Sequence, residues 1–281
     1  MIMGRQKVAY YLRKLYILQF VDYFLFLVNV LKTRKINQAF LAEHPDFNPP
    51  PSYLAYDAYN HTNWQTYHDM GLRHSELMSD LIKEYIHDQD IKICEWGCGP
   101  ARVIRHLDNI NGYKKIELFG TDYNEKSIAW CKNTFKKLDF LKNELEPPLS
   151  LDSNLFDCVY AISIFTHLSE KLHYSWIEEL FRILKPEGIL IFTTHGDICA
   201  KRLLPKEKEK YDSGSLVVKS QIKEGKKHFT TYHPPQFIRE KLLKGHAVVK
   251  HMKNAFAYQL EQEVWCVKKK RITNLALNAD G

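Results

Sequence analysis

The sequence predicts an α/β fold, a doubly wound and mostly parallel sheet with helices on both of its faces. From residue 90 onward, short apolar runs alternate with segments of helical periodicity, which is typical of parallel strands joined by crossover helices. The 281 residues are enough to bury a core without metals or disulfides. The 26% charged content is ordinary for a globular protein, so a wholly disordered chain and a polytopic membrane protein are both excluded.

Seven apolar runs are expected to form the strands of the sheet. They cover residues 91–96, 116–122, 139–143, 156–163, 188–195, 247–252 and 263–269. Helices are expected between them at residues 100–107, 125–137, 170–184 and 235–243. The last two runs follow each other without a helix between them, so we expect a hairpin whose final strand is antiparallel to the rest.

Four parts follow one another along the chain. They are an apolar and basic helical extension (1–40), a linker and cap helix (41–89), the domain that holds the sheet (90–269) and a tail (270–281). The cap helix is expected at about residues 74–87. Within the sheet domain, residues 198–230 form a charged, lysine-rich insertion.

The net charge of +7 is unevenly distributed along the chain. Residues 1–35, 201–227 and 268–271 carry net charges of +6, +5 and +4, so the remainder sums to −8. Basic charge confined to short segments is typical of solvated loops or of a contact with an anionic surface. A basic domain that wraps nucleic acid is therefore not expected.

The apolar run at residues 15–31 has only Gln19, Asp22 and Asn29 as polar members. It is shorter than the ~20 residues that cross a bilayer, and Asp22 near its centre would cost about 2.5–3.5 kcal/mol on insertion scales. On a helical wheel, its polar residues fall within an arc of about 140°. They are Lys14, Gln19, Asp22, Asn29 and Lys32. A helix packed on the body or on a second subunit, an interfacial membrane helix and a true span all stay open.

Six cysteines are scattered through the chain without a C-x-x-C pair. An even count alone does not define a disulfide framework in a chain of this length. We expect reduced thiols, which favours the cytoplasm. No small-residue cleavage site follows the first apolar stretch, so a signal peptide is not expected. The expected location is cytoplasmic, with peripheral membrane contact or oligomerisation through residues 1–40 as alternatives.

The turn after the first strand carries the most informative motif. It reads EWGCGPAR (residues 95–102), with Gly97 and Gly99 where the strand is expected to lead into a helix. Glycines there let the backbone approach a ligand, and a helix N-terminus offers free N–H groups. Asp122 ends the second strand, where a carboxylate can bind both ribose hydroxyls. The pattern predicts a nucleoside-containing cofactor at the switch point of the sheet.

The loop departs from the dinucleotide fingerprint G-x-G-x-x-G. Arg102 stands at the third glycine position, where its side chain would obstruct close packing of helix and strand. Glu95 ahead of the loop disfavours a pyrophosphate by charge and favours a ligand with an ammonium group. S-adenosylmethionine (SAM) has an ammonium, a sulfonium and a ribose, and it has no phosphate.

The pattern E-x-G-x-G resembles motif I of the class I SAM-dependent methyltransferases. FDCVYAISIFTHL (156–168) resembles the family's fourth motif, and RILKPEGILIFTTHG (182–196) the segment leading into its fifth strand. The resemblance covers about residues 64–269 and implies a Rossmann-like fold, methyltransferase activity and SAM as cofactor. More narrowly, EWGCGPARVIRHL, EPPLSLDSNLFD, SIFTHL and FTTHG are similar to a bacterial subgroup linked to surface-polysaccharide or other glycan modification.

Two residues depart from the family pattern without bearing on cofactor binding. Ala101 replaces the third family glycine, and Glu187 replaces the first glycine of the usual L-K-P-G-G. The D/N-P-P-Y signature of methylation at amino groups in DNA, RNA or glutamine is missing, and Ser163 begins the segment that stands there. The leading hypothesis is transfer to an oxygen of a small-molecule or glycan-type acceptor, with no nucleic-acid partner.

The resemblance assigns cofactor residues position by position. Gly97 and Gly99 are expected to form the SAM loop. Glu95 is expected near the methionine end of SAM, or else as a capping acid. Asp122 is expected on the ribose, with an N-cap of the following helix as the alternative, a role that Asn124 could fill.

Four further positions are candidates for the same pocket. Asn143, with Glu144 as a competitor, is expected to meet the adenine. Arg102 either binds the carboxylate of SAM or forms a salt bridge on its helix. Ser163 lines the pocket, and Tyr67 either contacts SAM from a lid or packs between helix and sheet. No structural metal is expected, because the histidines show no ligand spacing with cysteines or acids.

A hydroxyl acceptor also needs its proton removed, a task suited to a histidine near neutral pH. His167 follows the strand at 156–163 and His195 ends the strand at 188–195, so both are candidate bases. His233 is a weaker third candidate. The alternative for each is a hydrogen bond within its own loop.

Two other classes of function compete with methyl transfer. One is a catalytically silent SAM-fold scaffold or binding protein, against which the intact loop and Asp122 argue. The other is an NAD-type oxidoreductase, which Arg102 and Glu95 disfavour. The first 40 residues are expected to serve location or assembly rather than chemistry.

Overall fold

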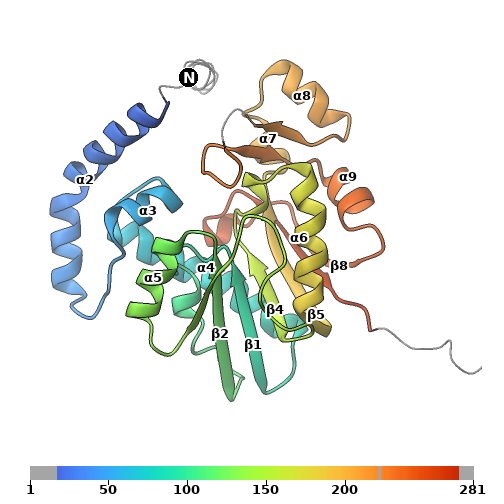
Figure 1. The fold of residues 1–281 in the computed structure, drawn as a ribbon, viewed down its shortest axis with the longest axis horizontal. Coiled ribbons are helices and arrows are strands. Elements are labelled where there is room, and N and C mark those ends of the chain that lie inside the picture. Colours follow the sequence, from blue (N-terminus) through green and yellow to red (C-terminus); the bar gives the residue numbers. More distant parts are fainter. Residues whose placement is uncertain (1–17, 221–222, 272–281) are drawn as a thin grey trace, which may run out of the picture.

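A seven-stranded sheet lies at the centre of the fold, as the alternating runs predict (Figure 1). The computed structural model describes residues 18–220 and 223–271, so Lys14 and the tail from residue 272 lie outside the described residues. The strands are β1 (Asp90–Trp96), β2 (Lys115–Asp122), β3 (Asp139–Lys142), β4 (Phe156–Ala161), β5 (Leu184–Thr194), β8 (Ala247–Met252) and β9 (Glu263–Lys268).

The strand order is β3-β2-β1-β4-β5-β9-β8. Neighbours from β3 through β5 pair in parallel, whereas β9 is antiparallel to both β5 and β8. The predicted hairpin and antiparallel last strand are therefore confirmed. The strand order reverses between β1 and β4, and this reversal is the switch point at which open α/β sheets bind ligands.

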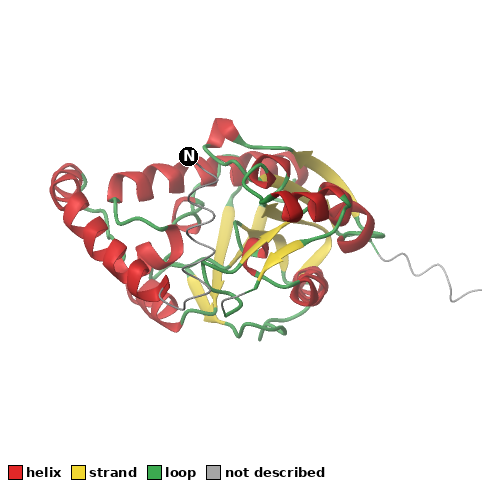
Figure 2. Cartoon of the chain, turned by 90° about the horizontal axis from the view of Figure 1, so that it is seen from above, coloured by secondary structure: helices red, strands yellow, loops and turns green. Residues whose placement is uncertain are grey.

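Helices cover both faces of the sheet (Figure 2). Strand residues alternate between the faces, so that Ile93 of β1 packs in the cluster with α4 (Trp64–Tyr85) and α5 (Glu125–Thr134), whereas Cys94 packs in the cluster with α6 (Glu170–Ile183). The insertion holds α7 (Asp197–Ala200), α8 (Pro205–Asp212) and β6 (Val217–Lys219), which pairs with β7 (Thr230–Tyr232). The remaining elements are α2 (Leu18–Glu43), α3 (Ser52–Tyr59), η1 (Ile104–His106), η2 (Phe165–His167), α9 (Pro235–Phe237), η3 (Ile238–Leu242) and η4 (Phe256–Tyr258).

The α-helix predicted at residues 100–107 is wrong. The segment is a turn followed by the short 3-10 helix η1. Gly99 and Ala101 both have left-handed φ angles, of 50° and 58°, which end any regular right-handed helix. Helix α4 also packs directly on the turn: a Cβ on Gly71 would lie 2.3 Å from the carbonyl oxygen of Arg102.

The cap helix is longer than predicted. Helix α4 begins at Trp64, ten residues before the expected start. Its N-cap is Asn63, whose side-chain oxygen accepts from the backbone N–H of Thr66 at 2.9 Å. The additional turns carry Tyr67, which places this residue against the loop after β1.

Helix α2 packs on the body through its polar residues. Asn29 accepts from the backbone N–H of Thr62 at 3.1 Å, and Asn37 accepts from that of Trp64 at 2.9 Å. Asp22 forms an ion pair with Lys227 at 2.9 Å. The polar arc that the wheel identifies therefore faces the protein at these positions, not the solvent. Within residues 18–220 and 223–271, no helix has both the length and the apolar character that crossing a membrane requires.

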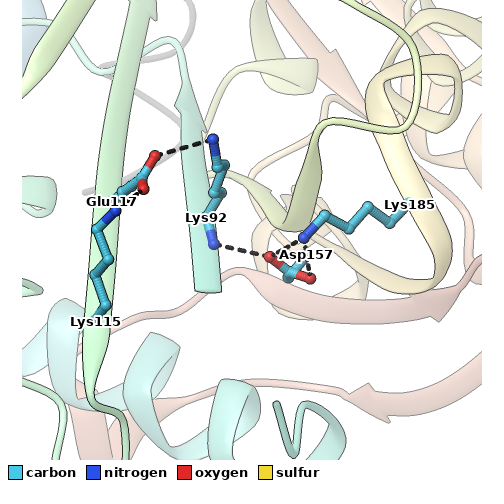
Figure 3. Close-up of polar contacts among 5 residues, drawn as sticks. All are labelled: Lys92, Lys115, Glu117, Asp157 and Lys185. Atoms are coloured by element: carbon cyan, nitrogen blue, oxygen red, sulfur yellow. Dashed lines mark hydrogen bonds and ion pairs between the residues drawn. The ribbon is translucent and has the colours of Figure 1, made fainter. Parts of the chain in front are cut away.

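An ion-pair network joins the amino-terminal ends of the strands, at the opposite end of the sheet from the switch-point loops (Figure 3). Asp157 of β4 accepts from the backbone N–H of Lys92 in β1 at 2.8 Å and pairs with Lys185 of β5 at 2.8 Å. Glu117 of β2 pairs with Lys92 at 3.0 Å and with Lys115 at 2.5 Å. One buried carboxylate thus ties three adjacent strands together, which sets their register at the edge away from the cavity described next.

Candidate functional site

A cavity of about 420 Å³ opens at the carboxyl edge of the sheet, where β1, β2, β4 and β5 end. We call it the cofactor cavity. Among the predicted site residues, those lining it are Gly97, Gly99, Arg102, Asp122, Ser163, His167 and His195. Other lining residues include Leu54, Asp57, Tyr59, Tyr123, Ile164, Gly225, Lys227 and Thr230. Residues from four strand ends therefore meet in one space.

The glycine loop is held in a tight turn against β2. The backbone N–H groups of Gly97 and Cys98 both donate to the carbonyl oxygen of Thr121, at 2.7 and 2.9 Å. Gly97 has φ 78°, and a Cβ there would lie 2.1 Å from Cδ1 of Ile164. Glycine is required at this position both for its backbone conformation and for the close approach.

Asp122 ends β2 beside this loop. Its Oδ2 accepts from the N–H of Gly99 at 2.8 Å, and its Oδ1 accepts from the N–H of Asn124 at 2.7 Å. Asn124 is the N-cap of α5, so the capping role considered for Asp122 is filled by its neighbour. Burial raises the pKa of Asp122 to about 6, against the lowering effect of the two backbone hydrogen bonds. Each oxygen keeps a lone pair with which it can accept from a ligand hydroxyl.

Glu95 faces inward from β1. Its Oε2 accepts from the N–H of Ile104 at 3.1 Å and from the hydroxyl of Tyr160 at 3.0 Å. Burial raises the pKa of Glu95 to about 8. Glu95 is absent from the cavity lining, and its bond to the N–H of the first residue of η1 agrees with the alternative of a capping acid. Its contact with the methionine end of SAM stays a prediction.

Arg102 lies in the cofactor cavity, and its guanidinium carbon lies 3.9 Å above the ring of Tyr59. Its Nε is buried and has no hydrogen-bond partner in the described part of the chain. No salt bridge to Arg102 is formed among those residues, so the guanidinium is available to an anionic ligand group. Tyr59, on α3, was missed from the sequence, where it sits in an aromatic and polar segment without a motif.

Tyr67 is fully buried and supports the loop from behind. Its hydroxyl donates to the carbonyl oxygen of Pro100 at 2.6 Å, and its ring packs edge-on against Tyr59. Tyr67 does not line the cofactor cavity. The structure shows the alternative, in which its buried ring packs between helix α4 and the loop after β1.

Asn143 lines a smaller cavity of about 60 Å³ next to the cofactor cavity, together with Asp122, Leu145 and Gly225. Its Nδ2 donates to the carbonyl oxygen of Glu144 at 2.6 Å. Its Oδ1 is buried without a partner among the described residues, although buried acceptors are normally paired. An amino group on an adenine ring would supply the missing donor.

The two candidate bases face the cofactor cavity with the same hydrogen-bond arrangement. Nδ1 of His167 lies 2.7 Å from the carbonyl oxygen of Phe229, and Nδ1 of His195 lies 3.1 Å from that of Thr231. A carbonyl oxygen can only accept, so each Nδ1 carries the proton and each Nε2 keeps a free lone pair. Burial lowers the pKa of His167, and it lowers that of His195 to about 3, so both rings are neutral at physiological pH.

His233 does not belong to the site. It is fully buried, it lines none of the described cavities, and its Nε2 lies 2.8 Å from Nε2 of His173. Nδ1 of His173 donates to the carbonyl oxygen of Ser169 at 2.7 Å, so the proton shared by the two rings sits on His233. The weaker third candidate base is therefore a structural residue.

Ser163 follows β4 with a left-handed φ of 64°. Its N–H donates to Oγ1 of Thr193 at 2.7 Å, and its Oγ accepts from Nε2 of Gln262 at 2.8 Å. Three segments thus fix an unfavourable backbone conformation at the cavity wall, which is where strained residues tend to cluster in functional sites.

A segment of the insertion, residues 223–228, lies over the cavities and is called the strap here. The N–H of Gly225 donates to the carbonyl oxygen of His167 at 3.0 Å, and the hydroxyl of Tyr123 donates to the carbonyl oxygen of Gly225 at 2.8 Å. At the next turn, Lys227 pairs with Asp22 of α2. The strap connects the cavity edge to the N-terminal helix, a contact that no local pattern in the sequence indicates.

The residues present fit SAM on three observations of this structure. Gly97 lies where a side chain would fill the loop, Asn143 Oδ1 is an unpaired acceptor, and Arg102 Nε is an unpaired donor. Asp122 lines both the cofactor cavity and the smaller cavity of Asn143, where its carboxylate would accept from a ribose. Among residues 18–220 and 223–271, no three histidine, cysteine, aspartate or glutamate side chains gather in a way that could hold a metal ion.

The sheet order and the glycine loop at its switch point define a Rossmann-like methyltransferase fold. Residues 94–192 match the family described as "Methyltransferase domain". This match covers about a third of the chain, and the sheet as a whole has the fold of a solved SAM-dependent methyltransferase.

Solved structures share this fold at low sequence identity. A SAM-dependent methyltransferase from Methanosarcina mazei has a TM-score of 0.52 and 18% identity, over 68% of this chain and 97% of that chain. Magnesium protoporphyrin IX methyltransferase from Synechocystis, solved with bound S-adenosylhomocysteine (SAH), has a TM-score of 0.52 and 13% identity, over 77% and 97%. At these identities the likeness concerns the fold alone.

Two curated relatives are each 28% identical to part of the chain. The tRNA N(3)-methylcytidine methyltransferase of Schizosaccharomyces pombe aligns over 135 residues, 46% of this chain and 43% of that protein. The malonyl-[acyl-carrier protein] O-methyltransferase of Bacillus anthracis aligns over 145 residues, 51% of this chain and 49% of that protein. The chain thus spans just under half the length of these relatives.

Proposed function

We propose that this protein binds SAM in the cofactor cavity and transfers its methyl group to an oxygen of a small-molecule or glycan-type acceptor. The observation that carries the proposal is that one cavity brings together the cofactor loop, Asp122 and two neutral histidines with a free Nε2. Gly97 and Gly99 place backbone against the methionine end, Asp122 accepts from the ribose, and Arg102 meets the carboxylate.

When bound, SAM supplies an electrophilic methyl group on a sulfonium, which an oxygen nucleophile takes while the sulfur keeps the electrons of the broken bond. His167 or His195 accepts the hydroxyl proton at Nε2, because its Nδ1 already donates to a backbone carbonyl. Residues of the strap and of α3 line the cavity, and exclusion of water by this cover would support transfer to the intended acceptor.

An oxygen acceptor other than a nucleic acid is supported by the pairing of the lysine-rich insertion. Lys219 pairs with Glu207 and Lys227 with Asp22, so the basic charge there is partly neutralised inside the protein. The Bacillus anthracis relative is named as an O-methyltransferase, which also supports an oxygen acceptor. The Schizosaccharomyces pombe relative acts on tRNA, so tRNA belongs among the acceptors to be tested.

The test is single-turnover transfer from radiolabelled SAM to fractionated cell material, with glycan, lipid, small-molecule and tRNA fractions assayed separately. We expect label in the glycan or small-molecule fraction, and a loss of label with His167→Ala or His195→Ala. His246→Ala is the matched control, because His246 stacks on Phe181 away from the cavity. Label in tRNA would overturn the proposed acceptor. SAM binding with no label in any fraction would favour a silent scaffold.

A further inference from the structure

The outward face of α2 carries a row of exposed apolar side chains. Phe20, Phe24 and Leu31 are 80%, 65% and 72% exposed, and Tyr23 and Leu27 are exposed beside them. Their spacing of three and four residues places them in one stripe along the helix. Single exposed apolar residues are ordinary on protein surfaces, whereas a contiguous stripe of this kind indicates a contact surface.

This stripe exists because the helix is turned with its polar residues inward. Asp22, Asn29, Thr33 and Asn37 all bond to the strap or to the segment before α4. The orientation of α2 is therefore fixed by specific hydrogen bonds, and its apolar side cannot rotate into the protein without breaking them. Both views show α2 at the periphery of the molecule (Figures 1 and 2).

Basic side chains extend the outward face of α2 beyond the apolar stripe. Arg34 and Lys35 lie one turn beyond Leu31 on the outward side and are exposed, and Lys32 is exposed next to them. The acids of α2 are Asp22, which is turned inward to Lys227, and Glu43, which is its last residue. The outward face from Phe20 to Lys35 thus combines apolar side chains with positive charge that forms no ion pair within residues 18–220 and 223–271.

We propose that the outward face of α2 binds the surface of an anionic lipid bilayer, with the helix lying in the plane of the interface. Phenylalanine, tyrosine and leucine side chains suit the boundary of acyl chains and headgroups, and lysine and arginine suit lipid phosphates. A second copy packed in parallel along this face would bring the basic residues of the two helices together. The proposal concerns binding to a surface and does not depend on the methyl acceptor.

The experiment measures co-sedimentation of the full chain with vesicles of phosphatidylcholine alone and with vesicles containing phosphatidylglycerol. We expect binding to the anionic vesicles that weakens as salt is raised. The double variant Arg34→Glu with Lys35→Glu should reduce binding to the anionic vesicles by more than tenfold, because each basic residue lost weakens binding roughly fivefold. Phe24→Ser with Leu31→Ser should also reduce it by at least about tenfold.

Matched controls are Lys206→Glu with Lys210→Glu on α8, and Phe256→Ser on η4, where the ring is 55% exposed. These variants should bind vesicles like the wild type. Thermal midpoints and circular dichroism verify that every variant folds. The proposal is overturned if the wild type ignores anionic vesicles, or if the α2 variants bind as well as the controls. It is also overturned if sedimentation shows a dimer that the α2 variants dissociate.

Discussion

The affinity for SAM is expected to fall as the pH drops below about 6, because Asp122 must be ionised to accept from the ribose hydroxyls. Burial raises the pKa of Asp122 to about 6 in the free protein. Binding favours the ionised form, so affinity is full above this pKa and is lost below it. At pH 5 only about a tenth of the carboxyl is ionised, so the dissociation constant should be about tenfold higher than at pH 8, or about 1.4 kcal/mol.

Isothermal titration calorimetry at pH 5, 6, 7 and 8 and constant ionic strength measures this dependence. Glu95, with a pKa raised to about 8, titrates in the same range. The Asp122→Asn variant therefore serves as the reference, because it keeps Glu95 and removes only the carboxyl under test. The reasoning is refuted if the wild type and Asp122→Asn show the same dependence on pH.

Three further outcomes are expected. His167→Ala and His195→Ala should each slow single-turnover transfer at saturating SAM, and the loss should be about 10²–10⁴-fold for the residue that acts as base. Burial lowers the pKa of His195 to about 3, so with His195 as the base the wild-type rate should stay flat from pH 8 down to 5.5. Burial also lowers the pKa of His167 below its ordinary value, so a rate that falls by half near pH 6.5 would contradict a neutral base at either position. Burial lowers the pKa of His173 to about 4, so the contribution of the neutral ring to the free energy of unfolding is complete above pH 6.5 and falls by about 1.4 kcal/mol per pH unit between pH 6.5 and 4. Urea titrations of the wild type and of His173→Phe should therefore diverge in that pH range. Parallel curves would argue against a lowered pKa of His173. Asp157→Ala should lower the free energy of unfolding by about 1–3 kcal/mol through the unpaired N–H of Lys92 while SAM affinity stays unchanged, and an equal loss of affinity would mean that this edge reaches the site.

The sheet and the cofactor loop could be predicted from the sequence because their signals are local. Short apolar runs mark the strands, and Gly97, Gly99 and Asp122 fall at strand ends whose position follows from those runs. Seven strands and the antiparallel last strand were both obtained in this way. The position of Asp122 beside the loop is a direct consequence of β1 and β2 pairing in parallel.

The structural features that the sequence could not predict depend on contacts between segments that are far apart in the chain. A helical wheel shows that Asp22 and Asn29 share a face, but it does not show which face meets the body. The missing helix after β1 results from the left-handed Ala101 together with Gly71 packing on the turn. The strap joins Gly225 to His167, residues that are 58 positions apart in the chain, and such a contact leaves no periodic signal.

The central claim is that the cavity at the carboxyl edge binds SAM. The most direct measurement is calorimetric titration of the full chain, and of its Asp122→Ala variant, with SAM, SAH and NAD at pH 7.5. We expect SAM and SAH to bind the wild type and NAD not to bind, and we expect the variant to lose roughly tenfold or more in SAM affinity through two charge-assisted hydrogen bonds. Binding of NAD without SAM, or equal affinity of the variant and the wild type for SAM, would contradict the claim.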